Sequence, residues 1–292
     1  GGQAPYTYAR EVLRLDQVGV EMVTALPAPG AADEVRWGNE SPRITLLENF
    51  LSEEECDHLV ELAKTRMHPS LVIGNGFKNE RAAVRTSSGA FLNDIVDPVL
   101  QRVETRLAFY AQIPREMAEG IQVLKYEVGQ EYVPHHDFLA KNSPAVTLWG
   151  QRQATTLMYL SDVEEGGETI FPSLLGNGTC GGKERNSICI KPKKGTALFW
   201  WDVMLDGGGN DGRTLHGGCP VVQGTKWVAT RWYRTRCYGY VECPDARARL
   251  DKERAEEARR AEEMRRAAGP QQARKGTLKT VVVGNAVGEI GS

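Results

Sequence analysis

The sequence predicts a mainly β fold, either a sandwich or a barrel, with helices packed outside it. A chain of 292 residues can bury a sizeable core, and 41% hydrophobic with 25% charged residues is ordinary for a globular protein. From about residue 120 onward, short strand-like runs are separated by Gly, Pro and Asp, as in all-β sandwiches and barrels. Two helical segments come before these runs, so we expect them to cover the outside of the β core.

The first part of the chain has little regular pattern. Residues 1–42 are predicted to form an N-terminal extension, in which "ALPAPGAAD" (25–33) is a flexible connector. "PRITLLENF" (42–50) has the composition of a strand. We therefore expect the main domain to start at residue 43 and to run to residue 240.

Two helices are predicted before the β region. In "LSEEECDHLVELAK", Ser52 and Glu55 form a capping box at the start of an amphipathic pattern. A second helix is predicted to begin near Asn93 or Asp94, with Pro98 tolerated near its first turn. The residues expected on its apolar face are Ile95, Val99, Val103 and Leu107.

The predicted strands of the β region are "IQVLKYEVGQEYVPHHDF", "QATTLMYLS", "GGETIFP", "SICIKPKKGTALFWW", "RTLHGGCP" and "TKWVATRWYRT". After residue 240 the composition changes. "DARARLDKERAEEARRAEEMRRAAG" is nearly all Ala, Glu and Arg, which predicts a solvated helix held by Glu–Arg pairs four residues apart. Residues 241–292 are therefore expected to be a charged helical tail.

Charge and cysteine content narrow the possible partners. A net charge of -2 gives no reason to expect nucleic acid or an anionic membrane as a partner. No run of 18 apolar residues occurs, so membrane attachment would need a segment outside this sequence. The six cysteines contain no CxxC pair, which disfavours a structural zinc site. With the sequons Asn39-Glu40-Ser41 and Asn177-Gly178-Thr179, they favour an oxidising, secretory compartment.

"YVPHHDF" (132–138) indicates two ligands of a metal site. Residues two apart in a strand project from the same face, so His135 and Asp137 would point together and His136 away from them. An imidazole and a carboxylate are two arms of the facial triad that binds Fe(II) in non-haem oxygenases. The pattern alone has a second interpretation, in which His135 is a strand-end histidine with Asp137 as its hydrogen-bonding partner.

A third ligand must come from the remaining histidines. The chain holds five, and His58 and His68 lie on or just after the first predicted helix. His216 stands at the entry to a later strand, where an antiparallel neighbour would bring it beside His135. His216 is therefore the candidate that we favour.

Lys226 follows His216 by ten residues and begins another strand. Alternation places it on one face with Val228, Thr230 and Trp232. A lysine inside a β-barrel is unfavourable unless it meets an anion, and the carboxylate of a bound small acid would satisfy it. The alternative is a solvent-facing lysine at a strand edge.

These residues resemble the Fe(II)- and 2-oxoglutarate-dependent dioxygenases of the prolyl 4-hydroxylase type, in particular the plant and algal enzymes that act on secreted proline-rich glycoproteins. Beyond HxD, the distal histidine and the lysine, the similar blocks run in consistent order over residues 43–237. They are "RTSSGAFL", "YEVGQEYVPHHDF", "QRQATTLMYLSDVEEGGETIFP", "IKPKKGTALFW" and "LHGGCPVVQGTKWVATRWYR". The resemblance implies a double-stranded β-helix, or jelly-roll, core.

The resemblance also implies roles for single residues. His135, Asp137 and His216 would be the iron ligands, and Lys226 would bind the distal carboxylate of 2-oxoglutarate. The other residues that it implies for the 2-oxoglutarate pocket are Tyr126, Thr169 and Trp232. Those implied to frame the peptide groove are Arg85, Thr86, Ser87, Ser88, Tyr132 and Arg152. His136 stands where the family usually has an aromatic or apolar residue, a departure on the side facing away from the iron.

An insertion between Thr169 and Lys191 is the expected place of a lid over the substrate. In similar enzymes a cysteine of this loop pairs with the one three residues after the distal histidine. The resemblance thus implies a Cys180–Cys219 disulfide, with Cys189 as the alternative partner.

The implied reaction is 4-hydroxylation of peptidyl proline in polyproline-II-like substrates, coupled to oxidative decarboxylation of 2-oxoglutarate to succinate and CO2. Fe(II), 2-oxoglutarate, O2 and ascorbate are the implied cofactors, and the lumen of the endoplasmic reticulum or Golgi is the implied location. Two alternatives stay open at this point. One is an oxygenase for peptidyl lysine or a free amino acid, and the other is a catalytically silent jelly-roll binding module.

Overall fold

The computed structural model describes residues 6–15, 18–27, 44–69, 72–73, 79–80, 86–93, 96–204, 209–238 and 259. The chain divides into two units, Gly1–Val241 and Glu242–Ser292. The described elements belong to the first unit, and the predicted charged tail lies outside the described residues apart from Arg259. The division into three parts at 42/43 and 240/241 stays a prediction.

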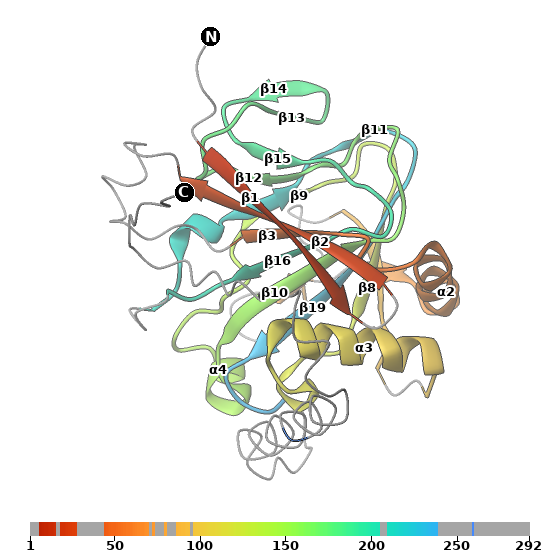
Figure 1. The fold of residues 1–292 in the computed structure, drawn as a ribbon, viewed down its shortest axis with the longest axis vertical. Helices are drawn as coiled ribbons and strands as arrows, with labels where there is room; N and C mark the ends of the chain where they lie inside the picture. Colours follow the sequence, from red (N-terminus) through yellow and green to blue (C-terminus); the bar gives the residue numbers. More distant parts are fainter. Residues whose placement is uncertain are drawn as a thin grey trace, which may run out of the picture. The chain divides into compact units, whose positions relative to one another are not determined.

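Two antiparallel sheets form the body of the described fold (Figure 1). In spatial order, the large sheet consists of β1 (Tyr6–Leu15), β2 (Val18–Pro27), β3 (Ile44–Glu48), β16 (Ala197–Trp201), β10 (Arg152–Tyr159), β19 (Lys226–Arg234), β8 (Gln122–Tyr126), β7 (Ser88–Phe91) and β4 (His68–Pro69). The small sheet consists of β15 (Ile188–Ile190), β12 (Thr169–Phe171), β17 (His216–Gly218) and β9 (Tyr132–His135).

Shorter elements complete the described fold. Three two-stranded pairs are β5 (Val72–Ile73) with β6 (Asn79–Glu80), β11 (Glu165–Gly166) with β18 (Val221–Gln223), and β13 (Gly178–Cys180) with β14 (Lys183–Arg185). The helices are α2 (Glu53–Lys64), α3 (Pro98–Ala111) and the short α4 (Pro144–Trp149), with 3-10 turns at Arg115–Met117 and Gly212–Thr214.

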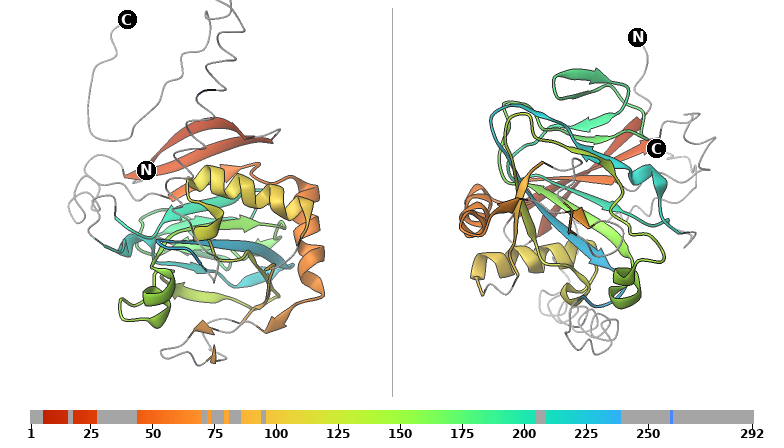
Figure 2. Two further views of the ribbon diagram at one scale, coloured as in Figure 1. Left: turned by 90° about the horizontal axis from the view of Figure 1, so that it is seen from below. Right: turned by 180° about the vertical axis from the view of Figure 1, so that it is seen from behind.

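Side-chain alternation gives the large sheet two different buried faces. Along β8, Val123 packs with the helices and the next residue, Leu124, packs with the small sheet. The helix-covered cluster includes Leu59 of α2 and Leu107 of α3. The ribbons of these two helices lie beside the sheet in Figure 2. Between the sheets lie Tyr159, Leu198, Trp200 and Val228 from the large sheet and Phe171 and Ile188 from the small one. The predicted mainly β core with helices outside it is therefore confirmed.

The first predicted helix is confirmed in detail. Ser52 Oγ accepts from the backbone N–H of Glu55 at 3.2 Å, and Glu55 Oε2 accepts from the N–H of Ser52 at 3.1 Å. This is the capping box expected from the sequence.

The second helix begins later than predicted. α3 starts at Pro98, and the side chain of Asp97 caps it by accepting from the N–H of Leu100 at 2.8 Å. A proline at the first helical position loses nothing, because its missing N–H would have no partner inside the helix. The expected start near Asn93 is therefore wrong, and Ile95 lies outside the described residues.

The predicted N-terminal extension contributes two strands that the sequence did not indicate. β1 and β2 form a hairpin, and β2 pairs with β3 from Glu21 opposite Glu48 to Thr24 opposite Thr45. Residues 25–27 of the expected connector belong to β2, and residues 28–33 lie outside the described part. The hairpin thus extends one edge of the large sheet.

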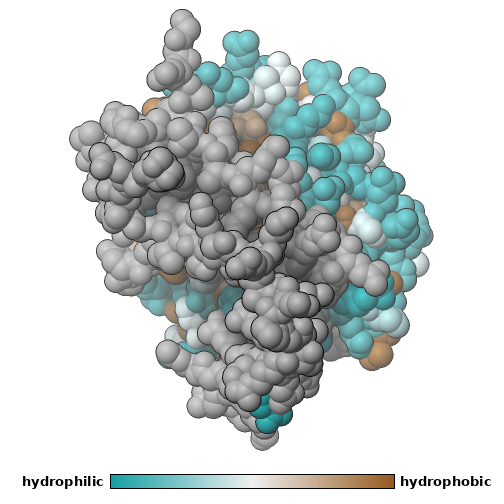
Figure 3. All heavy atoms as spheres, in the orientation of Figure 1, coloured by the Kyte–Doolittle hydropathy of each residue, from teal (hydrophilic) through white to brown (hydrophobic). Residues whose placement is uncertain are grey.

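No helix in the described part of the chain is long and apolar enough to cross a membrane. On the face drawn in Figure 3, the described atoms are largely hydrophilic, with hydrophobic side chains scattered among them.

A buried ion pair joins the two helices that cover the large sheet. Arg106 of α3 donates to both carboxylate oxygens of Glu55, at 2.7 and 3.0 Å, and to the carbonyl of Phe50 at 2.8 Å. Burial raises the pKa of Glu55, but its hydrogen bonds from Arg106 and Ser52 outweigh burial and hold that pKa below its ordinary value. The pair is therefore ionised at neutral pH.

We expect Arg106→Met to lower the free energy of unfolding by about 3–5 kcal/mol, because it leaves the Glu55 charge buried without its partner. Urea unfolding monitored by circular dichroism measures this change. Lys64→Met removes the exposed ion pair with Glu61 by the same substitution and should change stability by less than about 0.5 kcal/mol. Equal losses for the two variants would contradict the role of the buried pair.

Candidate metal centre and ligand pocket

Antiparallel pairing brings two histidines together across the small sheet. His216 of β17 lies directly opposite His135 of β9, as the sequence predicted. Gly217 makes this close approach possible, because a Cβ there would lie 2.9 Å from the carbonyl oxygen of Tyr132 and 3.0 Å from the nitrogen of Pro134. The ring centroids of the two histidines are 4.4 Å apart.

Asp137 reaches the same point from outside the strand. β9 ends at His135, and Asp137 lies in the bend that follows. His135 and Asp137 do converge on one point, as predicted. The expected cause, strand alternation, is wrong, because Asp137 does not belong to the strand. His136 points elsewhere, as predicted: its Nε2 lies 3.2 Å from the carbonyl of Gly212, and its ring stacks on Phe138.

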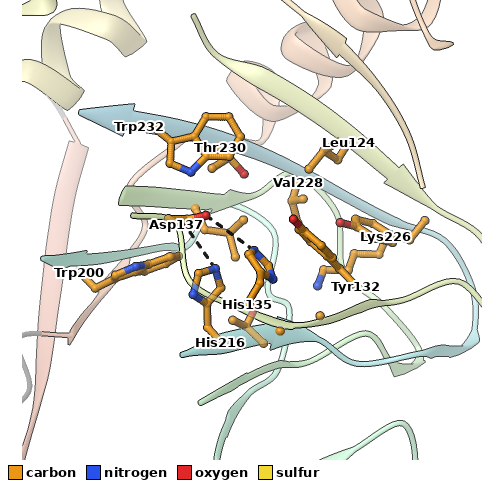
Figure 4. A pocket seen from close by; sticks show the side chains of 15 residues that line it. Leu124, Tyr132, His135, Asp137, Trp200, His216, Lys226, Val228, Thr230 and Trp232 are labelled. Atoms are coloured by element: carbon orange, nitrogen blue, oxygen red, sulfur yellow. Dashed lines mark ion pairs between the residues drawn. The ribbon is translucent and has the colours of Figure 1, made fainter. Parts of the chain in front are cut away.

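The three side chains form a compact donor set, in which the ligand atoms lie within 4.8 Å of one another. Nε2 of His135 is 3.7 Å from Oδ1 of Asp137, and Nε2 of His216 is 3.6 Å from Oδ2 (Figure 4). Two imidazoles and one carboxylate facing a common point, with open space beside them, fit the facial triad of a non-haem Fe(II) centre.

The backbone sets the tautomer of both histidines. Nδ1 of His135 lies 2.9 Å from the carbonyl of Val133, and Nδ1 of His216 lies 2.9 Å from the carbonyl of Thr214. A carbonyl oxygen only accepts, so Nδ1 carries the proton in each ring. The lone pair of each Nε2 can then bind a metal ion.

Asp137 is held in its ionised form. Burial raises its pKa, but the neighbouring His216, His135 and Arg152 outweigh burial and bring that pKa below the ordinary value. The site therefore presents one carboxylate charge beside two imidazole nitrogen donors.

One pocket joins the triad to the residues predicted to bind 2-oxoglutarate (Figure 4). Tyr126, Thr169, Lys226 and Trp232 all line it, as do Tyr132 and the three candidate ligands. Thr169 Oγ1 accepts from the hydroxyl of Tyr159 at 2.7 Å. The structure thus brings these residues together, while their individual roles stay predictions.

Lys226 is a buried cation that faces this pocket. It lies opposite Tyr126 in the pairing of β19 with β8, and the residue is only 3% exposed. Among the described residues, no hydrogen bond or ion pair satisfies its ammonium group, which lies 5.5 Å from the ring centre of Tyr126. Burial lowers the pKa of Lys226 to about 8. This environment fits a site for an anionic ligand.

Trp232 adds an unsatisfied donor to the same pocket. Its indole Nε1–H is buried and has no hydrogen-bond partner in the described part of the chain. Arg152 lies 3.9 Å above the indole ring and donates to Glu119 at 2.6 and 2.9 Å. A bound ligand with an acceptor atom would satisfy the indole N–H.

The predicted groove residues are partly described. Arg85 lies outside the described residues. Thr86 Oγ1 exchanges hydrogen bonds with the backbone of Glu131, Ser87 is buried, and Ser88 is half-buried on β7. Tyr132 lines both the metal pocket and a second, neighbouring pocket whose wall includes Pro134, Pro172, Cys180, Lys183, Arg185 and Pro220.

The predicted Cys180–Cys219 disulfide is present. It connects the β13–β14 hairpin, which lies in the insertion predicted from the sequence, to the residue after β17. Cys189, the alternative partner, is a free half-buried thiol.

Sequence reasoning missed two residues at this centre, Thr155 and Asp202. Thr155 of β10 donates to Oδ2 of Asp137 at 2.8 Å and lies 2.9 Å from Asp202. Neither residue belongs to a recognisable ligand motif. The signal that could have found them is the strand register that puts Thr155 opposite Trp200.

Comparisons with known proteins agree with this chemistry. Residues 121–234 match the model of the 2OG-Fe(II) oxygenase superfamily. "Prolyl 4-hydroxylase 1" of Arabidopsis thaliana is 45% identical over 234 residues, covering 77% of this chain and 75% of the relative. "Probable prolyl 4-hydroxylase 8" of the same plant is 44% identical over 208 residues, covering 68% and 70%.

Among solved structures, the viral collagen prolyl hydroxylase of Paramecium bursaria Chlorella virus-1 aligns with a TM-score of 0.49 and 28% identity, covering 65% of this chain and 94% of the viral protein. The assignment itself rests on the sequence relatives. With its triad and its match to these relatives, the chain belongs to the prolyl 4-hydroxylase family of Fe(II)- and 2-oxoglutarate-dependent dioxygenases.

Proposed function

We propose that this protein hydroxylates C4 of proline in proline-rich, polyproline-II-like peptides, with 2-oxoglutarate converted to succinate and CO2. The observation that carries the proposal is one pocket that holds both the triad and the unpaired, buried Lys226. The relatives are named prolyl 4-hydroxylases, which supports proline as the target.

The residues present fit the two groups that the reaction needs. His135, Asp137 and His216 would hold Fe(II), and Lys226 would bind the distal carboxylate of 2-oxoglutarate. When bound, the ferrous ion and 2-oxoglutarate supply the activation of O2 that oxidises the substrate C–H bond. We propose ascorbate as the reductant that keeps the iron ferrous.

The protein itself provides orientation and a dry pocket. Leu124, Leu157 and Val228 line the pocket and limit water around the reacting groups. Lys226 neutralises the far carboxylate of the dicarboxylate, and the indole N–H of Trp232 offers a hydrogen bond to an acceptor beside the triad. These groups are fixed before a ligand arrives, because each lies on a strand of the sandwich.

The neighbouring pocket supports an extended peptide as substrate. It begins at Tyr132 and Gly218, which also line the metal pocket, so a residue lying there is next to the triad. Its wall contains an aromatic ring and proline side chains, which suit the exposed rings of a polyproline-II chain. Lys183 and Arg185 lie on the same wall and disfavour a lysyl substrate by charge.

We also propose that the protein works in the lumen of the secretory pathway. The Cys180–Cys219 disulfide supports an oxidising compartment. Asn177 and Thr179 of the second sequon are exposed at the start of the β13–β14 hairpin, where a glycosyltransferase can reach them.

His216→Ala should lower succinate release by more than about 100-fold, because the loss of a ligand exceeds the effect of a residue behind a ligand. Succinate is measured with Fe(II), 2-oxoglutarate and ascorbate, with and without a proline-rich peptide, and the peptide is analysed for one added oxygen on proline. His136→Ala is the matched control, since His136 points away from the triad, and it should keep most of the activity. Turnover that a lysyl peptide stimulates and a prolyl peptide does not would refute the substrate assignment.

Lys226→Met should make the ligand-free protein more stable at pH 7, by up to about 3 kcal/mol. The pKa of Lys226 is about 8 in the folded protein and 10.5 ordinarily, so below pH 8 the folded state bears the whole penalty of a buried ammonium group. That penalty disappears as the pH rises from 8 to 10.5, so the advantage of the variant should shrink over this range.

Thermal unfolding with and without 2-oxoglutarate measures both parts of this prediction. The ligand should raise the melting temperature of the wild type and leave Lys226→Met almost unchanged. A variant that is less stable than the wild type at pH 7 would contradict the penalty for burying the ammonium group of Lys226. A variant that 2-oxoglutarate stabilises as much as the wild type would show that Lys226 is not the carboxylate site.

In secretory eukaryotic cells we expect one N-linked glycan on Asn177. Intact-mass measurement before and after peptide-N-glycosidase F should show its loss, and Asn177→Gln should abolish the difference. Asn39→Gln is the control, because Pro42 follows that sequon and disfavours its use. Secreted protein without any glycan on Asn177 would contradict this expectation.

A further inference from the structure

A buried chain of hydrogen bonds lies behind Asp137. The hydroxyl of Thr155 is 2.8 Å from Oδ2 of Asp137 and 2.9 Å from Oδ2 of Asp202. The exposed fractions are 4% for Asp137 and 0% for both Thr155 and Asp202, so water does not separate the three groups. The other oxygen of Asp202 accepts from the indole N–H of Trp200 at 3.0 Å.

The number of protons shared by these hydrogen-bonded groups determines which group donates to which. A threonine hydroxyl has one proton and can donate to only one of the two carboxyl groups. If both carboxyl groups were ionised, one short contact would be between two acceptors. One carboxyl group must therefore carry a proton, and that proton lies on the oxygen that faces Thr155.

The role of Asp137 as a ligand leaves the proton on Asp202. A carboxylate binds a metal ion in its deprotonated form, so Asp137 is the ionised member of the pair. Complete burial, together with the charge of Asp137, raises the pKa of Asp202 well above its ordinary value. The order of donation is then from Asp202 to Thr155 and from Thr155 to Asp137.

The backbone and Trp200 fix Asp202 in place. Its N–H donates to the carbonyl of Gln153 at 2.8 Å, and its carbonyl accepts from the N–H of Asp211 at 2.8 Å. The ring of Trp200 lies 4.6 Å from the imidazole of His216. The same cluster thus contacts two of the three candidate ligands.

We propose that Asp202 is a positioning residue for the metal site, acting as a neutral carboxylic acid that orients Thr155, which in turn holds Oδ2 of Asp137. This inference rests on Asp137 serving as a metal ligand, as the proposed function requires. The hydrogen bond occupies Oδ2 and leaves the lone pairs of Oδ1 free for the ion. A neutral second carboxyl group also keeps the donor set at a single negative charge.

A measurement of metal affinity distinguishes a residue that positions a metal ligand from a residue that takes part in the reaction. Co(II), which gives a visible spectrum at nitrogen and oxygen donors, is titrated into the metal-free wild type and four variants, and each dissociation constant is measured. Asp202→Ala and Thr155→Val should weaken binding by about 10–100-fold, the range typical of a lost partner behind a ligand. Circular dichroism and the melting temperature identify any variant that does not fold.

The conservative variants carry the decisive comparison. Asp202→Asn keeps an acceptor for Trp200 and a neutral donor for Thr155, and Thr155→Ser keeps the bridging hydroxyl, so both should bind Co(II) within about 3-fold of the wild type. If Asp202→Asn loses as much affinity as Thr155→Val, Asp202 acts as an anion and the proposal is overturned. It is also overturned if a folded Thr155→Val binds as tightly as the wild type.

The outcome for the wild type distinguishes this inference from the proposed function. Wild-type protein that binds no Co(II) would overturn the metal site itself, and the proposed function with it. Tight wild-type binding that all four variants share would leave the proposed function intact and remove only the role of Asp202.

Discussion

The pairing of β9 with β17 is the constraint on which the rest of the site depends. It sets His135 directly opposite His216, with their ring centroids 4.4 Å apart, and no other described histidines are so placed. The pairing needs Gly217, where any side chain would collide with the backbone of Tyr132 and Pro134. Cys219 follows directly and attaches the β13–β14 hairpin, so a single short strand positions a ligand, the wall of the neighbouring pocket and the disulfide.

Charge is distributed to keep the pocket ready for ligands, at the expense of stability. Arg152 donates to Glu119, and Arg234 lies 2.7 Å from the same carboxylate. Two cations share one anion there, and the charge of Arg152 helps to lower the pKa of Asp137. Lys226 lies buried in the same pocket and forms no ion pair with a described residue. Selection for folding alone would replace such a lysine, and proteins tolerate exceptions of this kind at functional sites.

The sequence predicted the candidate ligands because few alternatives existed. Five histidines, one HxD pattern and strand-like flanks left His216 as the favoured partner. The start of α3 was predictable as well, since Asp97 before Pro98 is a capping signal, but the apolar spacing of Ile95 pointed to an earlier start. Asp202 was not predictable, because its contact with Thr155 depends on the register between β10 and β16. The local sequence patterns of these two strands do not indicate how the strands align. The β1–β2 hairpin was missed for the same reason, since its strands are defined by pairing with β3.

The pocket lies between the two sheets, and this location explains why we propose a positioning role for a residue as small as Thr155. His135 and His216 belong to the small sheet, whereas Lys226 and Trp232 belong to β19 of the large sheet. A dicarboxylate that binds the metal at one end and Lys226 at the other must therefore span the sandwich. The hydrogen bond from Thr155 on β10 to Asp137 after β9 crosses the same space. It ties a candidate metal ligand to the large sheet, so the spacing between metal and Lys226 is set by the protein before any ligand enters.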